Sequence, residues 1–141
     1  VEKLDQLAGE NGADVVGVLM RGQASNQLAH KLESTGDLEG ARARFETAKR
    51  LLQQVMSVEP KEWRLLEKLV VANEGLARVW STKGDRSKEV ASYTEAIENV
   101  RKAIAGHMAS GAREPLPPFI TELMRPLHLR AAWLRALHFL K

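Results

Sequence analysis

The chain of 141 residues contains no cysteine. Disulfide bonds, thiolate metal ligands and cysteine nucleophiles are therefore excluded, and a reducing compartment is permitted. Long apolar runs are also missing: they extend over only a few residues, as in Leu69-Val70-Val71, whereas a membrane-spanning helix needs about 20. What is present, 44% hydrophobic and 28% charged residues, is typical of one soluble domain with its own core. We expect a cytoplasmic protein, and the composition argues against a membrane partner.

Aromatic residues and an excess of one charge are scarce as well. Aromatic residues make up 5% of the chain, and the formal net charge is only +3. A nucleic-acid-binding module would cluster its Lys and Arg with aromatic rings that stack on bases. Here basic residues alternate with acidic ones. The sequence therefore argues against a nucleic-acid partner.

The spacing of apolar residues predicts helix almost throughout the chain. In the stretch 38–55 they recur at steps of three and four, the period that places them on one helix face. These residues are Leu38, Ala41, Phe45, Ala48, Leu52 and Val55. Similar spacing continues in 62–82 and 86–104, whereas Gly17 and Gly22 weaken the prediction for the first half of 13–34, because glycine in a helix costs about 1 kcal/mol relative to alanine. No strand pattern is sustained, so the predicted fold class is all-α.

Short connections between these helices predict antiparallel helix hairpins. The stretch 106–118 differs, because its glycines and prolines predict an irregular loop, and Pro126 predicts a kink in the helix that follows. The predicted division of the chain is 1–12, the end of a preceding helix or a leader; 13–58, a first hairpin; 61–105, a second hairpin; 106–118, a loop; and 119–141, a capping helix.

Two features of the sequence concern the origin of the chain. It begins at Val1 rather than at methionine, so we expect a fragment of a larger protein. Residues 106–110 read GHMAS, which is either a native loop or the scar of a cloning vector. In the second case, residues 111–141 would be a foreign peptide fused to a shorter domain.

One phrase occurs twice in the chain. GDLEGARARFETA at 36–48 returns as GDRSKEVASYTEA at 84–96, 48 residues later (84 − 36). Such self-similarity is typical of a supersecondary unit that is repeated. The superposed pairs are Leu28 with Leu76, Ala29 with Ala77, Leu32 with Trp80, Phe45 with Tyr93, and Ala48 with Ala96.

These residues resemble the tetratricopeptide repeat family, whose unit is a helix hairpin with small residues where its two helices touch. The resemblance covers about residues 22–104. It departs from the family at Glu89, which replaces the small residue that Ala41 supplies in the first copy. The family's Trp is absent, since Ser25 and Asn73 stand in its places, and its Pro is absent, since Gln53 and Arg101 do. The long period is similar to the long-helix variety found in bacterial multidomain signalling proteins.

The resemblance implies a superhelix of stacked hairpins whose first helices form a concave surface that binds peptides or partner proteins. It places eight residues on that surface, although these residues can equally be the solvated faces of helices. The eight residues are Gln23, Asn26, His30, Glu33, Val71, Glu74, Arg78 and Ser81. Asn26, His30, Glu74 and Arg78 are the expected polar contacts. The function expected from the resemblance is that of a non-enzymatic scaffold or adaptor module for protein–protein interaction.

No catalytic site, metal site or cofactor is predicted. The four histidines never form the i, i+3 or i, i+4 pairs that place two imidazoles on one helix face. These histidines are His30, His107, His128 and His138. A Gly-rich phosphate loop, a nucleophile elbow and paired carboxylates in a pocket-like context are also missing from the sequence. We therefore expect that the chain is not an enzyme.

Two alternative functions remain open. The ends of a helical array without polar caps expose apolar surface that favours association. The chain is therefore also a candidate for self-association as a homo-oligomer. The last helix is basic and amphipathic, with Arg125, Arg130 and Arg135, a pattern that also suits an anionic membrane or nucleic acid. The competing interpretation is a cap that packs through one apolar face and leaves the arginines in water. That face is Leu129, Trp133, Ala136, Leu137 and Leu140.

Overall fold

The computed structural model describes residues 12–58, 63–109, 111 and 118–139, and in these residues the fold is all-α, as predicted. The predicted leader at 1–12 lies outside the described residues except for Gly12, which begins the first described helix. The described helices are α2 (Gly12–Ser34), α3 (Leu38–Val58), α4 (Trp63–Thr82), α5 (Arg86–Ala109) and α6 (Pro118–Phe139). None of them is both long enough and apolar enough to cross a membrane.

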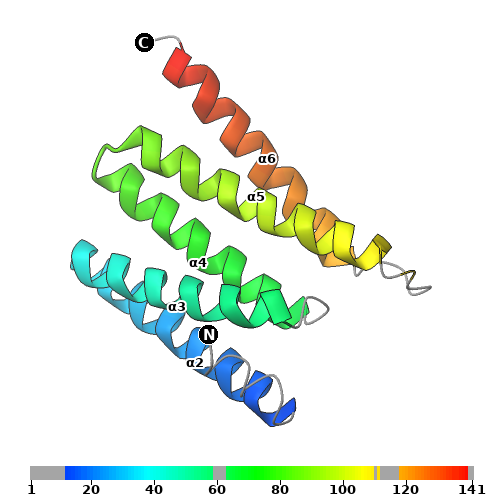
Figure 1. Ribbon diagram of the computed structural model, residues 1–141. Coiled ribbons are helices and arrows are strands. Elements are labelled where there is room, and N and C mark those ends of the chain that lie inside the picture. The colour runs from blue at the N-terminus through cyan, green and yellow to red at the C-terminus, as the bar shows by residue number, and fades with distance from the viewer. Residues whose placement is uncertain (1–11, 59–62, 110, 112–117, 140–141) are drawn as a thin grey trace.

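The helices stack in chain order (Figure 1). Each helix packs against the next one along the chain, and α2 also contacts α4. Helix α6 crosses α5, and its C-terminal half diverges from it (Figure 1). Because α2 touches α4 directly, residues from these two helices, far apart in the sequence, share one side of the molecule.

The repeated Gly-Asp pair forms the same turn in both places. Gly36 and Gly84 have φ values of +89° and +77°, a conformation that glycine adopts without steric penalty. The amide N–H of Asp37 donates to the carbonyl of Leu32 (2.9 Å), and that of Asp85 donates to the carbonyl of Trp80 (2.9 Å). These bonds close the preceding helix in a Schellman motif.

Each aspartate of the pair then begins the next helix. Asp37 Oδ1 accepts a hydrogen bond from the backbone N–H of Gly40 (2.9 Å), and Asp85 Oδ1 accepts one from the N–H of Lys88 (3.1 Å). Such bonds satisfy helix donors that have no partner within the helix. The repeated phrase therefore specifies a helix end, a turn and a helix start within a few residues.

The core forms where small residues let helices approach closely. Ala29, Ala41 and Ala48 are fully buried. At Gly22 of α2, a Cβ would lie 2.7 Å from Cδ2 of Leu52 in α3, so this glycine is needed for the packing of the two helices. The cost that Gly22 adds to helix formation is offset by this contact, and the helix predicted over 13–34 continues through it.

One feature of the C-terminal part differs from the sequence-based expectation. Helix α5 continues through Gly106 to Ala109, although an irregular loop is predicted from 106. His107 is buried in this last turn, and such packing can sustain a helix beyond a glycine. Pro126 lies within α6, which extends as one helix on both sides of it.

The predicted packing face of the last helix is wrong at Trp133, whose exposed fraction is 59%. Among the α6 side chains that the structure describes, the buried ones are those of Leu127, Ala131 and Leu134, at steps of four and three. Trp133 follows Ala131 by two residues, about 200° around the helix. The small Ala131 side chain permits close approach to α5, which a Trp would prevent. The side chains of Leu129, Ala136, Leu137 and Leu140 lie outside the described residues.

Candidate functional site

The residues predicted for the concave surface lie on α2 and α4, but they differ in exposure. Gln23, His30, Arg78 and Ser81 are exposed. Glu33, Val71 and Glu74 are partly buried, and Asn26 is buried.

Arg78 of α4 joins α4 to α2. Its Nε donates to Oε2 of Glu33 (3.1 Å), and its Nη2 donates to Oε1 of the same carboxylate (3.2 Å). Nη2 also lies 3.3 Å from Nδ1 of His30. The His30 ring meets Phe45 edge to face, with centroids 5.2 Å apart. The structure thus brings together three of the predicted residues, His30, Glu33 and Arg78, as a clamp between two helices.

Asn26 is not available to a partner, contrary to the prediction. Its exposed fraction is 3%, and its Nδ2 donates to the backbone carbonyl of Lys68 in α4 (3.1 Å). Asn26 lies four residues after Gly22 and three before Ala29, so it shares their buried helix face. That spacing is the signal in the sequence that assigns Asn26 to packing.

A hollow of about 340 Å³ lies between α4, α5 and α6. Two of the predicted residues, Glu74 and Arg78, form its α4 side. The other lining residues are Tyr93 of α5 and Glu122, Pro126, Leu127 and Arg130 of α6. Gln23, His30, Val71 and Ser81 do not line it.

The α5 and α6 residues that line the hollow are not predicted from the sequence as site residues. The sequence predicts only a packing role for Tyr93, because its place in the repeat pairs it with Phe45. Residues of α6 are considered only for a cap or for a basic surface. No signal in the sequence relates the register of α6 to that of α4, since the two helices meet only across the hollow.

The hollow has a partly desolvated carboxylate at its α4 side. Burial raises the pKa of Glu74 above its usual value, and the positive charge of Arg78 lowers this pKa by a smaller amount. At the α6 side, the guanidinium of Arg130 lies 5.8 Å from the centroid of the Tyr93 ring, within the range of a cation–π contact. The arrangement offers charges of both signs above an apolar base.

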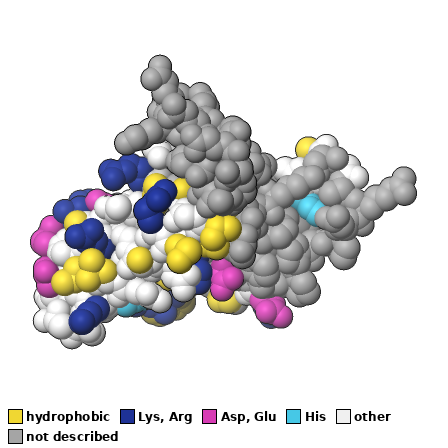
Figure 2. Space-filling model, turned by 90° about the horizontal axis from the view of Figure 1, so that it is seen from below, with side chains coloured by type: hydrophobic (Ala, Val, Ile, Leu, Met, Phe, Trp, Pro, Cys, Tyr) yellow, Lys and Arg dark blue, Asp and Glu magenta, His cyan; other side chains and the backbone are white. Residues whose placement is uncertain are grey.

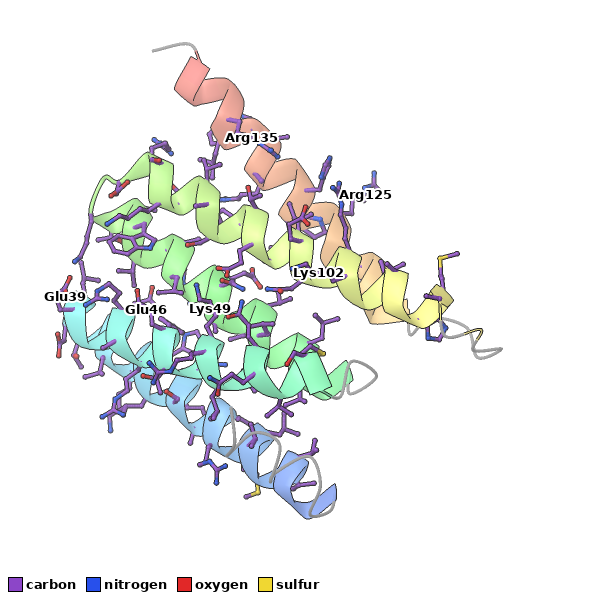
Figure 3. All side chains as sticks on the ribbon, in the orientation of Figure 1. Glu39, Glu46, Lys49, Lys102, Arg125 and Arg135 are labelled. Carbon is purple, nitrogen blue, oxygen red and sulfur yellow. The ribbon has the colours of Figure 1, made fainter. Side chains whose placement is uncertain are left out.

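Several charges along α3 have a different character, because they are paired within the helix or with residues outside it. Figure 3 labels Glu39, Glu46 and Lys49 on this helix. Arg42 bonds to Glu39 (3.1 Å) and to Glu46 (2.8 Å), and Lys83 forms an ion pair with Glu39. Lys49 and Gln53 both donate to the Glu95 carboxylate of α5, at 2.8 and 3.0 Å. Because these charges are already paired, they are less available to a ligand than the charges that line the hollow.

Chemically, the hollow is equipped for binding. Its side chains include neither a Ser, Cys or Lys nucleophile nor a histidine base. Among the described residues, no group of three or more His, Asp or Glu could hold a metal ion. A carboxylate, guanidinium groups and a tyrosine ring can recognise a charged side chain by pairing and stacking. Comparisons with protein-family models, with curated proteins and with solved structures gave no match.

Proposed function

We propose that this chain is a non-enzymatic interaction module of the tetratricopeptide-repeat type, which binds a peptide or a partner protein along α2, α4 and α6. In this arrangement α2 with α3 and α4 with α5 are successive hairpins, and α6 begins a third layer that caps the second. Support comes from the identical hydrogen bonds of the Gly36-Asp37 and Gly84-Asp85 turns. Support also comes from the small residues of the repeated unit that are fully buried, such as Ala29 and Ala48.

The hollow between α4 and α6 is the observation that carries the proposal. A peptide along the first helices of successive hairpins would pass over it, and Glu74 and Arg78 lie at its edge. Its volume of about 340 Å³ is at the small end of the range for ligand pockets. It therefore suits one side chain of a bound segment rather than a large cofactor.

Peptide selection followed by a blocking variant tests this function. A displayed random library is selected on the immobilised domain, and a recovered peptide is titrated by fluorescence anisotropy. Glu122→Trp places a large side chain at the rim of the hollow, where Glu122 is exposed. Glu98→Trp is the matched control, because Glu98 is an exposed residue of α5 that does not line the hollow.

We expect Glu122→Trp to weaken peptide binding at least tenfold and Glu98→Trp to leave it unchanged. Circular dichroism must show the same helix content and the same thermal midpoint in both variants. Equal affinities for the two variants would mean that the peptide binds on another face.

A second candidate function is self-association through the outer side of α2. Val16, Met20 and Leu28 of this helix have exposed fractions of 41%, 65% and 39%, and their spacing of four and eight residues places them along one side of α2. Figure 2 views the molecule from the α2 side and shows hydrophobic groups set between Lys and Arg side chains. Sedimentation velocity at increasing concentration tests this function, with Met20→Glu as the variant that should abolish any dimer. A monomer at every concentration would exclude it.

A further inference from the structure

The charges around the hollow are unbalanced. Glu74 and Glu122 both line it, and neither makes a hydrogen bond or ion pair with another described residue. Arg78 binds the Glu33 carboxylate through two nitrogen atoms, and its positive charge also acts on Glu74. Among these described residues, the two guanidinium groups of Arg78 and Arg130 therefore face three carboxylates, those of Glu33, Glu74 and Glu122.

The base of the hollow contains a buried polar side chain that points to a ligand. Tyr93 has an exposed fraction of only 7%, lines the hollow, and its hydroxyl has no hydrogen-bond partner among the described residues. Its ring already attracts one cation, the guanidinium of Arg130 at 5.8 Å. Leu127 and Pro126 add apolar surface beside it, of the kind against which the methylene stem of a long basic side chain packs.

We propose that the hollow receives the side chain of a lysine or an arginine from the bound segment, with its charge between Glu74 and Glu122 and its stem against Tyr93 and Leu127. This inference rests on the proposed function, because it names the chemistry of the segment that binds there.

The other classes of side chain fit the hollow less well. An acidic side chain would meet two carboxylates, and to pair with Arg78 it would have to compete with Glu33. An apolar side chain would remove more water from Glu74 without supplying a partner, which is unfavourable for a carboxylate. A cation instead pairs with the partly desolvated Glu74, and pairing of this kind favours the charged carboxylate.

Three blocked pentapeptides test the inference directly. They are acetylated, amidated alanine peptides with arginine, glutamate or leucine at the central position, titrated to millimolar concentration into the 15N-labelled domain. The arginine peptide should shift backbone amide signals of α4 and α6 around the hollow, with an affinity at least fivefold higher than that of the other two. Glu74→Gln combined with Glu122→Gln should abolish this preference, whereas the control Glu98→Gln should keep it.

A second readout distinguishes recognition of charge from nonspecific binding. Binding of the arginine peptide should lower the pKa of Glu74, followed through its side-chain carboxyl carbon by NMR, and 0.5 M salt should weaken binding. Equal or tighter binding of the glutamate or leucine peptide at the hollow would overturn the inference and leave the proposed function standing. Absence of a response to all three peptides would also overturn it, and the Glu122→Trp experiment then decides the proposed function separately.

Discussion

The ring of Phe45 in α3 lies against the backbone of Gly75 in α4. A Cβ at position 75 would fall 2.3 Å from Cζ of Phe45 and within 2.6 Å of two further ring atoms. Phe45 is fully buried, so the ring has little freedom to move away. This contact limits how closely α3 and α4 approach each other, and it connects the aromatic residue of the repeated phrase to a glycine outside it.

Replacement of this glycine should destabilise the domain. Gly75→Ala gains about 1 kcal/mol of helix propensity, but the added methyl group overpacks the Phe45 ring, for which about 1–3 kcal/mol is typical. We expect a net loss of about 1 kcal/mol in the free energy of unfolding, measured by urea titration. Gly17→Ala is the control, since a Cβ there meets only the Arg21 side chain at 3.8 Å. That variant should be more stable than the wild type, and a stabilised Gly75→Ala would contradict the close contact.

The clamp between α2 and α4 should contribute little energy. Arg78 and Glu33 form a bidentate pair, but the Arg78 side chain is 43% exposed, and partly exposed pairs typically contribute about 0.2–1 kcal/mol. A double-mutant cycle with Arg78→Ala and Glu33→Ala should therefore give a coupling energy below about 1 kcal/mol that decreases in high salt. A coupling of several kcal/mol would show that the pair is more deeply desolvated than its exposure indicates.

Asn73 should be replaceable by an apolar residue. It is fully buried, and neither atom of its amide has a hydrogen-bond partner among the described residues. A buried polar group without a partner is unfavourable by about 1–3 kcal/mol, so Asn73→Leu, which has a similar size, should raise the thermal midpoint. Asn26→Leu is the informative comparison, because it removes the bond to the Lys68 carbonyl and should be destabilising. A lower midpoint for Asn73→Leu would indicate that its amide has a partner.

Glu74 should make stability depend on pH in a defined direction. Its pKa in the folded state is raised above 4.5, mainly by burial, so the folded state favours the protonated carboxyl. The resulting stabilisation is fully present below the unfolded pKa and is lost as the pH rises through the folded pKa. Glu74→Gln should therefore be more stable than the wild type at pH 7, and this difference should disappear below about pH 4.5. Thermal unfolding at several pH values measures it, and a difference that grows in acid would contradict the direction of the shift.

The sequence predicts the helical fold and the two turns because the relevant signals are local. Helix periodicity, the positive φ of Gly36 and the capping bond of Asp37 each depend on residues a few positions apart. The residues of the binding site are harder to predict, because their exposure depends on contacts between helices that are distant in sequence. Exposure of one helix face can be proposed from spacing, as for Arg78, but Glu74 is partly buried, and Asn26 is buried because α4 covers it.

By itself, the sequence determined an all-helical chain with a repeated turn, and it predicted a binding surface that includes Glu74 and Arg78. Only the tertiary structure decided that Arg78 binds Glu33, that Trp133 faces outward, and that α6 completes the hollow with Arg130. The physical reason is the range of the forces involved. Hydrogen bonds of turns and caps act within a few residues, whereas the register of one helix on another follows from how side chains distant in sequence fill space together.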